Sequence, residues 1–273
     1  CRLNNFKGEK KMIDVHVHLE NGPYTKEWLD QFVNKAIERK IKEVYFLEHT
    51  FVFKEFYFLY DEMKNYNAYQ NNWYGNKVKK ARNINEYIKF VEEMKKYKFP
   101  IKMKFGLEVC YSPEHEEQIK VWKEKLPLDF MVGAVHFIDG WAFGHKMQKW
   151  KCEDYDMNKI YKRYFQLFID LAKSKLFDGL AHPNALQCFG AFPPGGFYPM
   201  YVELAKQIKA NNMYIEESSG LSINYGNMPL GMNYDMLEAM RKEGVEICTA
   251  SDAHNPKDLG KYIKEMEKYI LLR

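Results

Sequence analysis

Short apolar runs recur seven times along this chain, and a longer stretch with helical spacing follows each of them. The runs cover residues 13–19, 43–49, 101–108, 129–136, 177–182, 213–218 and 246–254. The helical stretches cover residues 25–39, 83–97, 114–124, 156–175, 199–210, 234–242 and 256–270. Strand–helix alternation of this kind predicts a parallel sheet covered by helices.

No linker-like segment separates the seven units, which favours a closed barrel over the alternative, an open doubly wound sheet. We therefore expect an α/β fold with one barrel domain over residues 12–273. A polar, lysine-rich N-terminal tail over residues 1–11 precedes it. The stretch 51–82 is long and rich in aromatic residues for a strand-to-helix connection, so we expect it to form a wall over a site.

Composition argues against several other classes of protein. No apolar run approaches the ~18 residues of a membrane span. The five cysteines are odd in number, scattered and without C-x-x-C spacing, which argues against disulfides and cysteine zinc sites and favours a cytoplasmic protein. A net charge of +4, with lysines beside glutamates on the predicted helices, marks no nucleic-acid surface. The oligomeric state is not predicted.

The first apolar run, IDVHVHL, contains two histidines two residues apart. Because side chains alternate between the two faces of a strand, His16 and His18 are expected on one face, with Asp14 behind them. Val15 and Val17 are expected on the opposite face. Two adjacent buried imidazoles rarely both find hydrogen-bond partners in a plain core, so the pair indicates a functional site.

Polar side chains also stand at the end of nearly all the remaining apolar runs. In a barrel, residues at the carboxyl ends of the strands meet in one cavity. The residues expected there in this chain are His16, His18, His49, Glu108, His136, His182, Asp252 and His254. Any single histidine of this set is equally well explained as a core residue with its hydrogen bonds made. That explanation does not account for the pattern across all the strands. Imidazoles and carboxylates without thiolates suit zinc, manganese or iron. The set exceeds the ligands of one tetrahedral ion, so we expect two or three ions, as in a multinuclear metal hydrolase.

These motifs resemble those of the polymerase and histidinol phosphatase (PHP) superfamily, in the same order over almost the whole chain. They are H-x-H at 16–18, the acid–His pair at 48–49, Glu108, GAVH at 133–136, AH at 181–182 and SDAH at 251–254. The stretch VGAVHFIDGW more particularly resembles the histidinol-phosphatase branch. The resemblance implies a distorted (β/α)7 barrel, similar to a TIM barrel, with a trinuclear metal centre.

The resemblance also implies how the ligands are shared. One ion would be held by His16, His18, Glu108 and Asp252, a second by Glu108, His136 and His182, and a third by His49 and His254. In many relatives a residue in the loop after H-x-H completes the third site. In this chain Glu20 is the candidate for that position.

The residues that would bind a substrate phosphate depart from the family pattern. Relatives carry basic residues after the fifth and sixth strands, where this chain has Gln187-Cys188 and Ser222-Ile223. Four other cations are candidates, although an exposed surface position explains each equally well; they are Lys54, Arg82, Lys162 and Arg163.

We expect hydrolysis of a small phosphate monoester by attack of a metal-bridging hydroxide, and the resemblance alone names histidinol phosphate. Asp252 is the candidate for holding the hydroxide or moving a proton. His254 or a metal-bound water is the candidate for protonating the leaving alkoxide. An aromatic wall would exclude water; its expected members are Phe51, Phe53, Phe56, Trp73 and Trp141. Two alternatives are an amidohydrolase-like hydrolase of C–N bonds or lactones and a non-catalytic or nuclease-type PHP module.

Overall fold

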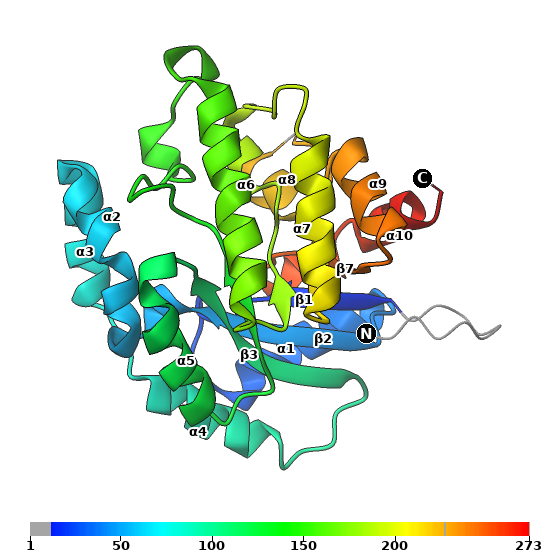
Figure 1. Ribbon diagram of the computed structural model, residues 1–273. Helices are drawn as coiled ribbons and strands as arrows, with labels where there is room; N and C mark the ends of the chain where they lie inside the picture. Colours follow the sequence, from blue (N-terminus) through cyan, green and yellow to red (C-terminus); the bar gives the residue numbers. More distant parts are fainter. Residues whose placement is uncertain (1–11, 227, 273) are drawn as a thin grey trace.

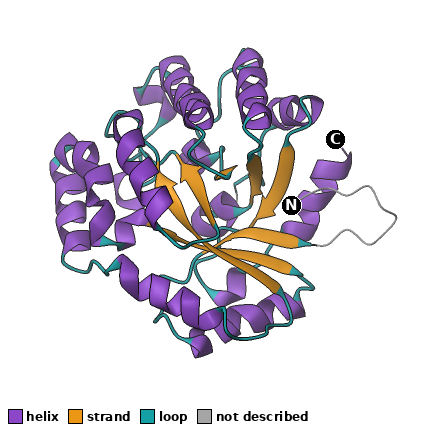
Figure 2. Cartoon of the chain, turned by 60° about the horizontal axis from the view of Figure 1, so that its bottom comes forward, coloured by secondary structure: helices purple, strands orange, loops and turns teal. Residues whose placement is uncertain are grey.

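The computed structural model describes residues 12–226 and 228–272, so the expected tail over 1–11 lies outside the described residues. One parallel sheet runs in the order β1 to β7, and helices surround it (Figures 1 and 2). The strands are β1 (Ile13–Val17), β2 (Glu43–His49), β3 (Lys102–Cys110), β4 (Phe130–Ala134), β5 (Gly179–Leu180), β6 (Tyr214–Ser218) and β7 (Glu246–Ala250). The helices are α1 (Lys26–Glu38), α2 (Asp61–Tyr66), α3 (Ala68–Val78), α4 (Ile84–Met94), α5 (Glu116–Lys125), α6 (Met157–Ser174), α7 (Tyr198–Ala210), α8 (Gly220–Tyr225), α9 (Tyr234–Lys242) and α10 (Ile263–Leu272).

The first and last strands close the sheet through a short contact. Val17 forms an isolated parallel bridge with Ala253, just beyond the end of β7. The N–H of Asp252 donates to the C=O of His16 at 2.9 Å, which ties the ends of β1 and β7 together at the metal-ligand positions.

A buried carboxylate on β1 strengthens this closure. Asp14 accepts hydrogen bonds from the backbone N–H and the hydroxyl of Ser251, at 2.8 and 2.6 Å, and from the N–H of Gly260 at 2.8 Å. The sheet is therefore a nearly closed, distorted seven-stranded barrel, which confirms the predicted fold over the open doubly wound alternative.

Strand β1 departs from strict alternation. Its register against β2 shifts between Asp14 and Val17, as at a β-bulge. As a result Val15 packs in the apolar cluster inside the barrel, while Val17 packs in the outer layer beneath the helices. The prediction that both valines share the face opposite the histidines was therefore wrong for Val15, because a bulge inserts one residue into the pattern.

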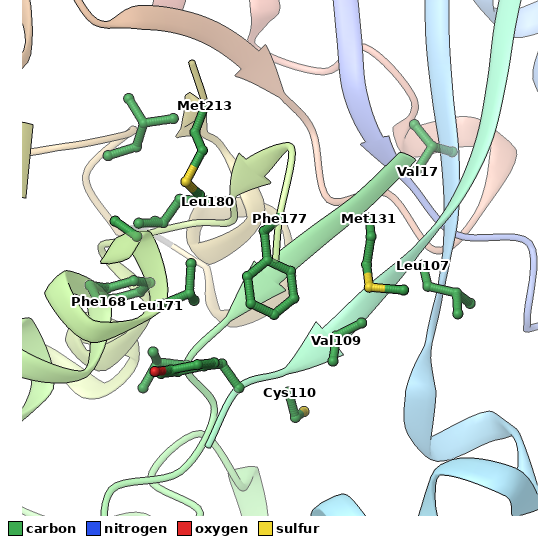
Figure 3. Close-up of a cluster of buried hydrophobic side chains, with 14 of the residues drawn as sticks. Val17, Leu107, Val109, Cys110, Met131, Phe168, Leu171, Phe177, Leu180 and Met213 are labelled. Carbon is green, nitrogen blue, oxygen red and sulfur yellow. The ribbon is translucent and has the colours of Figure 1, made fainter. Parts of the chain in front are cut away.

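Two apolar layers hold the barrel. The inner cluster consists of strand residues and includes Tyr45, Leu47 and Phe130. The outer layer joins the other faces of the strands to the helices. Figure 3 shows part of it, with Leu171 beside Phe168 on α6 and Met131 of β4 beside Leu107 of β3. Since both faces of the sheet are filled with apolar side chains, polar groups collect at the strand ends.

Helices α1 and α6 each begin after a side chain that accepts a hydrogen bond from the first turn. Thr25 accepts a hydrogen bond from the N–H of Trp28 at the start of α1, and Asp156 accepts one from Lys159 at the start of α6. The long connection after β2 contains the 3₁₀ helix η2 (Lys54–Tyr60), α2 and α3, which stand beside the barrel (Figure 1).

Candidate metal centre

The eight polar side chains expected at the strand ends meet in one place. His16, His49 and Glu108 lie on β1, β2 and β3, and His18 directly follows β1. His136 and His182 follow β4 and β5, and Asp252 and His254 follow β7. Their ligand atoms form four overlapping groups, each with all atoms within 4.8 Å; the groups are His18–His49–His254, His16–His18–Asp252, His16–Glu108–His182 and His49–Glu108–His136.

Glu108 lies at the centre of these groups and is buried. Its Oε1 lies 2.8 Å from Nε2 of His182 and 3.2 Å from Nε2 of His136. Its Oε2 lies 3.1 Å from Nε2 of His49 and 3.4 Å from Nε2 of His16. Burial raises the pKa of Glu108, but the surrounding imidazoles, His49 first, outweigh burial and hold that pKa well below its usual value. Each oxygen faces a different pair of histidines, which suits a carboxylate that bridges two ions.

Several buried polar atoms have no partner unless a cation is bound. Oε2 of Glu108 and Nδ1 of His18 accept no hydrogen bond. Nε2 of His16 lies 2.9 Å from Nε2 of His18, so two imidazole nitrogens face each other. Burial lowers the pKa of His18 to about 3, which leaves this ring neutral with a free lone pair. This set of nitrogen and oxygen donors fits a borderline divalent cation.

The ring nitrogens that point away from the centre have partners of their own. Nδ1 of His16 lies 2.9 Å from Oε1 of Glu216 on β6, and Nδ1 of His136 lies 3.0 Å from Sγ of Cys110 on β3. Metal-binding histidines commonly donate this second N–H to an acceptor that fixes the ring. Burial lowers the pKa of His16, but the carboxylates of Glu216 and Glu108 raise it well above its usual value.

Glu20 lies beside His49, and its direct coordination of a third ion stays a prediction. Its Oε2 lies 2.9 Å from Nδ1 of His49, and it belongs to none of the four groups of ligand atoms found in the described residues. Burial raises the pKa of Glu20, but His49, and after it His18 and His254, hold that pKa well below its usual value. Glu20 therefore lies close to the group His18–His49–His254.

Two of the predicted ligands have unusual backbone conformations. His182 has a φ of 24° and Asp252 a φ of 54°, in the region that residues other than glycine rarely adopt. Such conformations cost about 1–3 kcal/mol each and collect at functional sites. Gly220 of α8 leaves room for the side chain of Asp252, because a Cβ at Gly220 would overlap the Asp252 carboxylate.

A cavity of about 470 Å³ opens over the ligands. Its aromatic lining includes Phe51 and Trp73, as expected for the wall, together with Phe137, Phe143 and Tyr225. Three other expected members do not line it. Phe53 and Phe56 are buried in the outer apolar layer, and Trp141 stacks on Tyr155 at 5.1 Å. The sequence could not separate these roles because all are aromatic residues of long loops.

None of the four expected phosphate-binding cations lines this cavity. Arg82 donates to the backbone oxygens of Glu20 and Gly22, and Arg163 pairs with Asp139 at 2.8 Å. Lys54 and Lys162 are exposed.

Lys146 is the one lysine or arginine of the described residues that lines the cavity. Its Nζ lies 5.0 Å from the ring centre of Tyr225, and no salt bridge joins Lys146 to a carboxylate among the described residues. His145 lines the cavity beside it, and burial lowers its pKa to about 4.

Sequence reasoning missed Glu216, Cys110 and Lys146. Glu216 could have been found, because strand alternation places it on the same face as Tyr214 and Ser218, inside the barrel. Lys146 carried no such signal, since it lies in the irregular connection between β4 and α6, whose path depends on tertiary contacts.

Fold and site together define a barrel protein with clusters of histidine and carboxylate side chains that can bind metal at the carboxyl ends of its strands, the arrangement of metal-dependent hydrolases. The sequence pattern of the PHP domain family matches residues 14–220, and the chain belongs to this family. No helix among the described residues is long and apolar enough to span a membrane.

Individual proteins that are similar to this chain are named as histidinol phosphatases. A protein of Deinococcus radiodurans named as a probable histidinol-phosphatase is 23% identical over 189 residues, which cover 66% of this chain and 69% of the relative. The crystal structure of a histidinol phosphate phosphatase from Lactococcus lactis, with zinc, L-histidinol and phosphate, is similar with a TM-score of 0.67. It is 18% identical and the match covers 96% of this chain and 93% of that one.

A structure from Listeria monocytogenes assigned to the histidinol phosphatases gives the same TM-score of 0.67 at 18% identity, over 92% of this chain and 99% of that one. At this level of identity the two structures establish the common fold.

Proposed function

We propose that this protein is a metal-dependent phosphatase of small phosphate monoesters, with histidinol phosphate as the first candidate substrate. The observation that carries the proposal is the meeting of eight nitrogen and oxygen ligands beneath an aromatic-lined cavity. The names of the relatives from Deinococcus radiodurans and Lactococcus lactis support this reaction and this substrate.

The ligand groups support two or three ions of zinc, manganese or iron. One ion would be held by His16, His18, Glu108 and Asp252, a second by Glu108, His136 and His182, and a third by His49 and His254. The zinc in the Lactococcus lactis structure favours zinc among these metals. When bound, such ions neutralise phosphoryl charge and provide a hydroxide nucleophile near neutral pH.

Asp252 is the candidate for holding the attacking water and accepting its proton. Burial raises the pKa of Asp252, but a hydrogen bond with His18 and the nearby His254 and His16 hold it well below its usual value. Its Oδ2 accepts a hydrogen bond from the amide of Asn224 at 3.1 Å, which fixes the carboxylate at the edge of the cavity. An ionised, fixed carboxylate at this place can accept a hydrogen bond from the attacking water and so orient it.

His254 is the candidate for protonating the leaving alkoxide. It lines the cavity, and its Nδ1 lies 3.1 Å from the backbone oxygen of Asp252, which orients the ring. Its other nitrogen remains available for a ligand or for a proton on the side of the substrate.

Lys146 replaces the four cations expected from the sequence as the candidate for binding the substrate's phosphate. Tyr225 donates a hydrogen bond to the C=O of Gly144 at 2.7 Å, and this contact holds the loop that carries Lys146 against α8. An ammonium group that has no carboxylate partner can bind a phosphate dianion without first breaking an ion pair.

The test is to measure metal content by elemental analysis and then phosphate release. Metal-free protein is reloaded separately with Zn, Mn and Fe and assayed on phosphate monoesters that include histidinol phosphate, and on amides and lactones. We expect stoichiometric metal and metal-dependent release of phosphate. Hydrolysis of amides or lactones alone would favour the C–N or lactone hydrolase, and protein that retains no metal would favour a non-catalytic module.

A further inference from the structure

Glu216 is a buried carboxylate that touches two different ligand strands. It lies on β6 inside the barrel and is fully buried. Its Oε1 and Oε2 lie 2.9 and 3.0 Å from Nδ1 of His16, at the end of β1. Its Oε2 also accepts a hydrogen bond from the backbone N–H of His182, just after β5, at 3.1 Å. One side chain therefore connects β6 with ligands on β1 and β5.

The contact with His16 decides which ring nitrogen faces the metal centre. A carboxylate accepts hydrogen bonds but does not donate them, so it holds a proton on Nδ1 of His16. Nε2 is then the nitrogen left for coordination. It points to the centre, 2.9 Å from Nε2 of His18 and 3.4 Å from Oε2 of Glu108.

The contact with His182 supports its backbone, which lies beyond the end of strand β5. Strand β5 has only two residues and ends before His182, whose φ of 24° is unfavourable for a residue with a Cβ. The hydrogen bond to Glu216 satisfies the N–H of His182 in this conformation. Since the same backbone turn directs the imidazole to Oε1 of Glu108 at 2.8 Å, Glu216 also governs where His182 points.

We propose that Glu216 is a positioning residue of the metal centre, which fixes the tautomer of His16 and the backbone of His182 so that both imidazoles face the same ions. The inference rests on the metal-dependent function proposed above. Glu216 itself belongs to none of the ligand groups in the described residues, so it acts through the histidines.

The test compares Glu216→Gln with Glu217→Gln. Glu217 is the matched control, because it is the next residue of the same strand and equally buried, but its Oε2 accepts from the N–H of Met232 away from the metal centre. Zinc affinity is measured by competition with a chromophoric chelator. We expect Glu216→Gln to weaken binding of at least one zinc ion by about 10–100-fold and Glu217→Gln to change it less than about threefold.

A second measurement needs no substitution at Glu216, so it decides the question even if Glu216→Gln does not fold. In the zinc-loaded wild-type protein, NMR should show a slowly exchanging Nδ1–H on His16. A proton on Nε2 of His16 would overturn the inference, as would a Glu216→Gln protein that binds zinc as tightly as Glu217→Gln. Wild-type protein that binds no zinc, manganese or iron would overturn the proposed function, and the inference with it.

Discussion

The carboxylate of Glu20 contacts the imidazole of His49 at the ring nitrogen that does not face Glu108. Oε2 of Glu20 lies 2.9 Å from Nδ1 of His49, and Nε2 of the same ring lies 3.1 Å from Oε2 of Glu108. Phe51 stacks on this imidazole with 4.6 Å between ring centres. Burial lowers the pKa of His49, but Glu20 and Glu108 on its two sides raise it. His49 is thus held between two carboxylates, of which only Glu108 belongs to a ligand group.

Substitution of Glu20 should weaken the binding of one metal ion and leave the binding of the others unchanged. Glu20→Gln removes the charge behind His49, so we expect about tenfold weaker binding of the ion at His49 and His254. The measurement is metal content after dialysis against a graded series of chelator concentrations. Glu43→Gln, at the opposite end of β2, is the control. Complete loss of that ion in Glu20→Gln at every metal concentration would instead indicate direct coordination by Glu20.

The strand-end ligands could be read from the sequence, because alternation of apolar runs and helices determines both the barrel and the edge where polar residues meet. Local spacing did not reveal the bulge in β1 that turns Val15 inward. It also could not tell Phe51, which lines the cavity, from Phe53, which packs in the core.

The cation that lines the cavity was missed for a related reason. Lys146 is one of many lysines, and a hydrogen bond between Tyr225 and Gly144, far apart in sequence, holds its loop over the cavity. Long-range contacts of this kind leave no periodic signal in the sequence.

Asp252→Asn should abolish turnover and preserve the fold. The amide has nearly the same shape but cannot accept a proton from the attacking water, so we expect kcat to fall by about 100-fold or more. Steady-state kinetics at saturating metal measures the effect, and circular dichroism checks the fold. Asp258→Asn in the following 3₁₀ helix is the control. Wild-type kcat in Asp252→Asn would exclude Asp252 from proton transfer.

Lys146→Ala should impair substrate binding more than turnover. Loss of one charged contact to a phosphate is worth about 1.5–3 kcal/mol, so we expect KM and the inhibition constant of inorganic phosphate to rise by about 10–100-fold. Lys149→Ala is the matched control, because it lies in the same loop and does not line the cavity. Equal KM values in the two variants would leave Lys146 without a role in phosphate binding.

Cys110 should act on His136 as an acceptor of a hydrogen bond. Its Sγ lies 3.0 Å from Nδ1 of His136, and the hydroxyl of Tyr60 donates to the same sulfur at 3.4 Å. Cys110→Ser retains an acceptor and Cys110→Ala does not, so zinc affinity should fall in the order wild type, Ser, Ala, with a loss of about tenfold or more in Ala. Cys188→Ala, another buried cysteine outside the cavity lining, is the control. Indistinguishable affinities in the Ser and Ala variants would contradict this order.

Asp14 should make the stability of the metal-free protein depend on pH. Burial raises its pKa from 3.8 to about 6, against the hydrogen bonds from Ser251 and Gly260 that lower it. Because the folded state binds this proton more tightly than the unfolded chain, the contribution to stability is complete below pH 3.8 and is lost as pH rises through about 6. The loss amounts to about 3 kcal/mol, since one unit of pKa corresponds to about 1.4 kcal/mol. Urea unfolding of wild type and Asp14→Asn, with chelator at pH 4 to 7, measures this loss of stability. The free energy of unfolding of wild type relative to Asp14→Asn should decrease across this range. A constant difference would show that Asp14 does not titrate there.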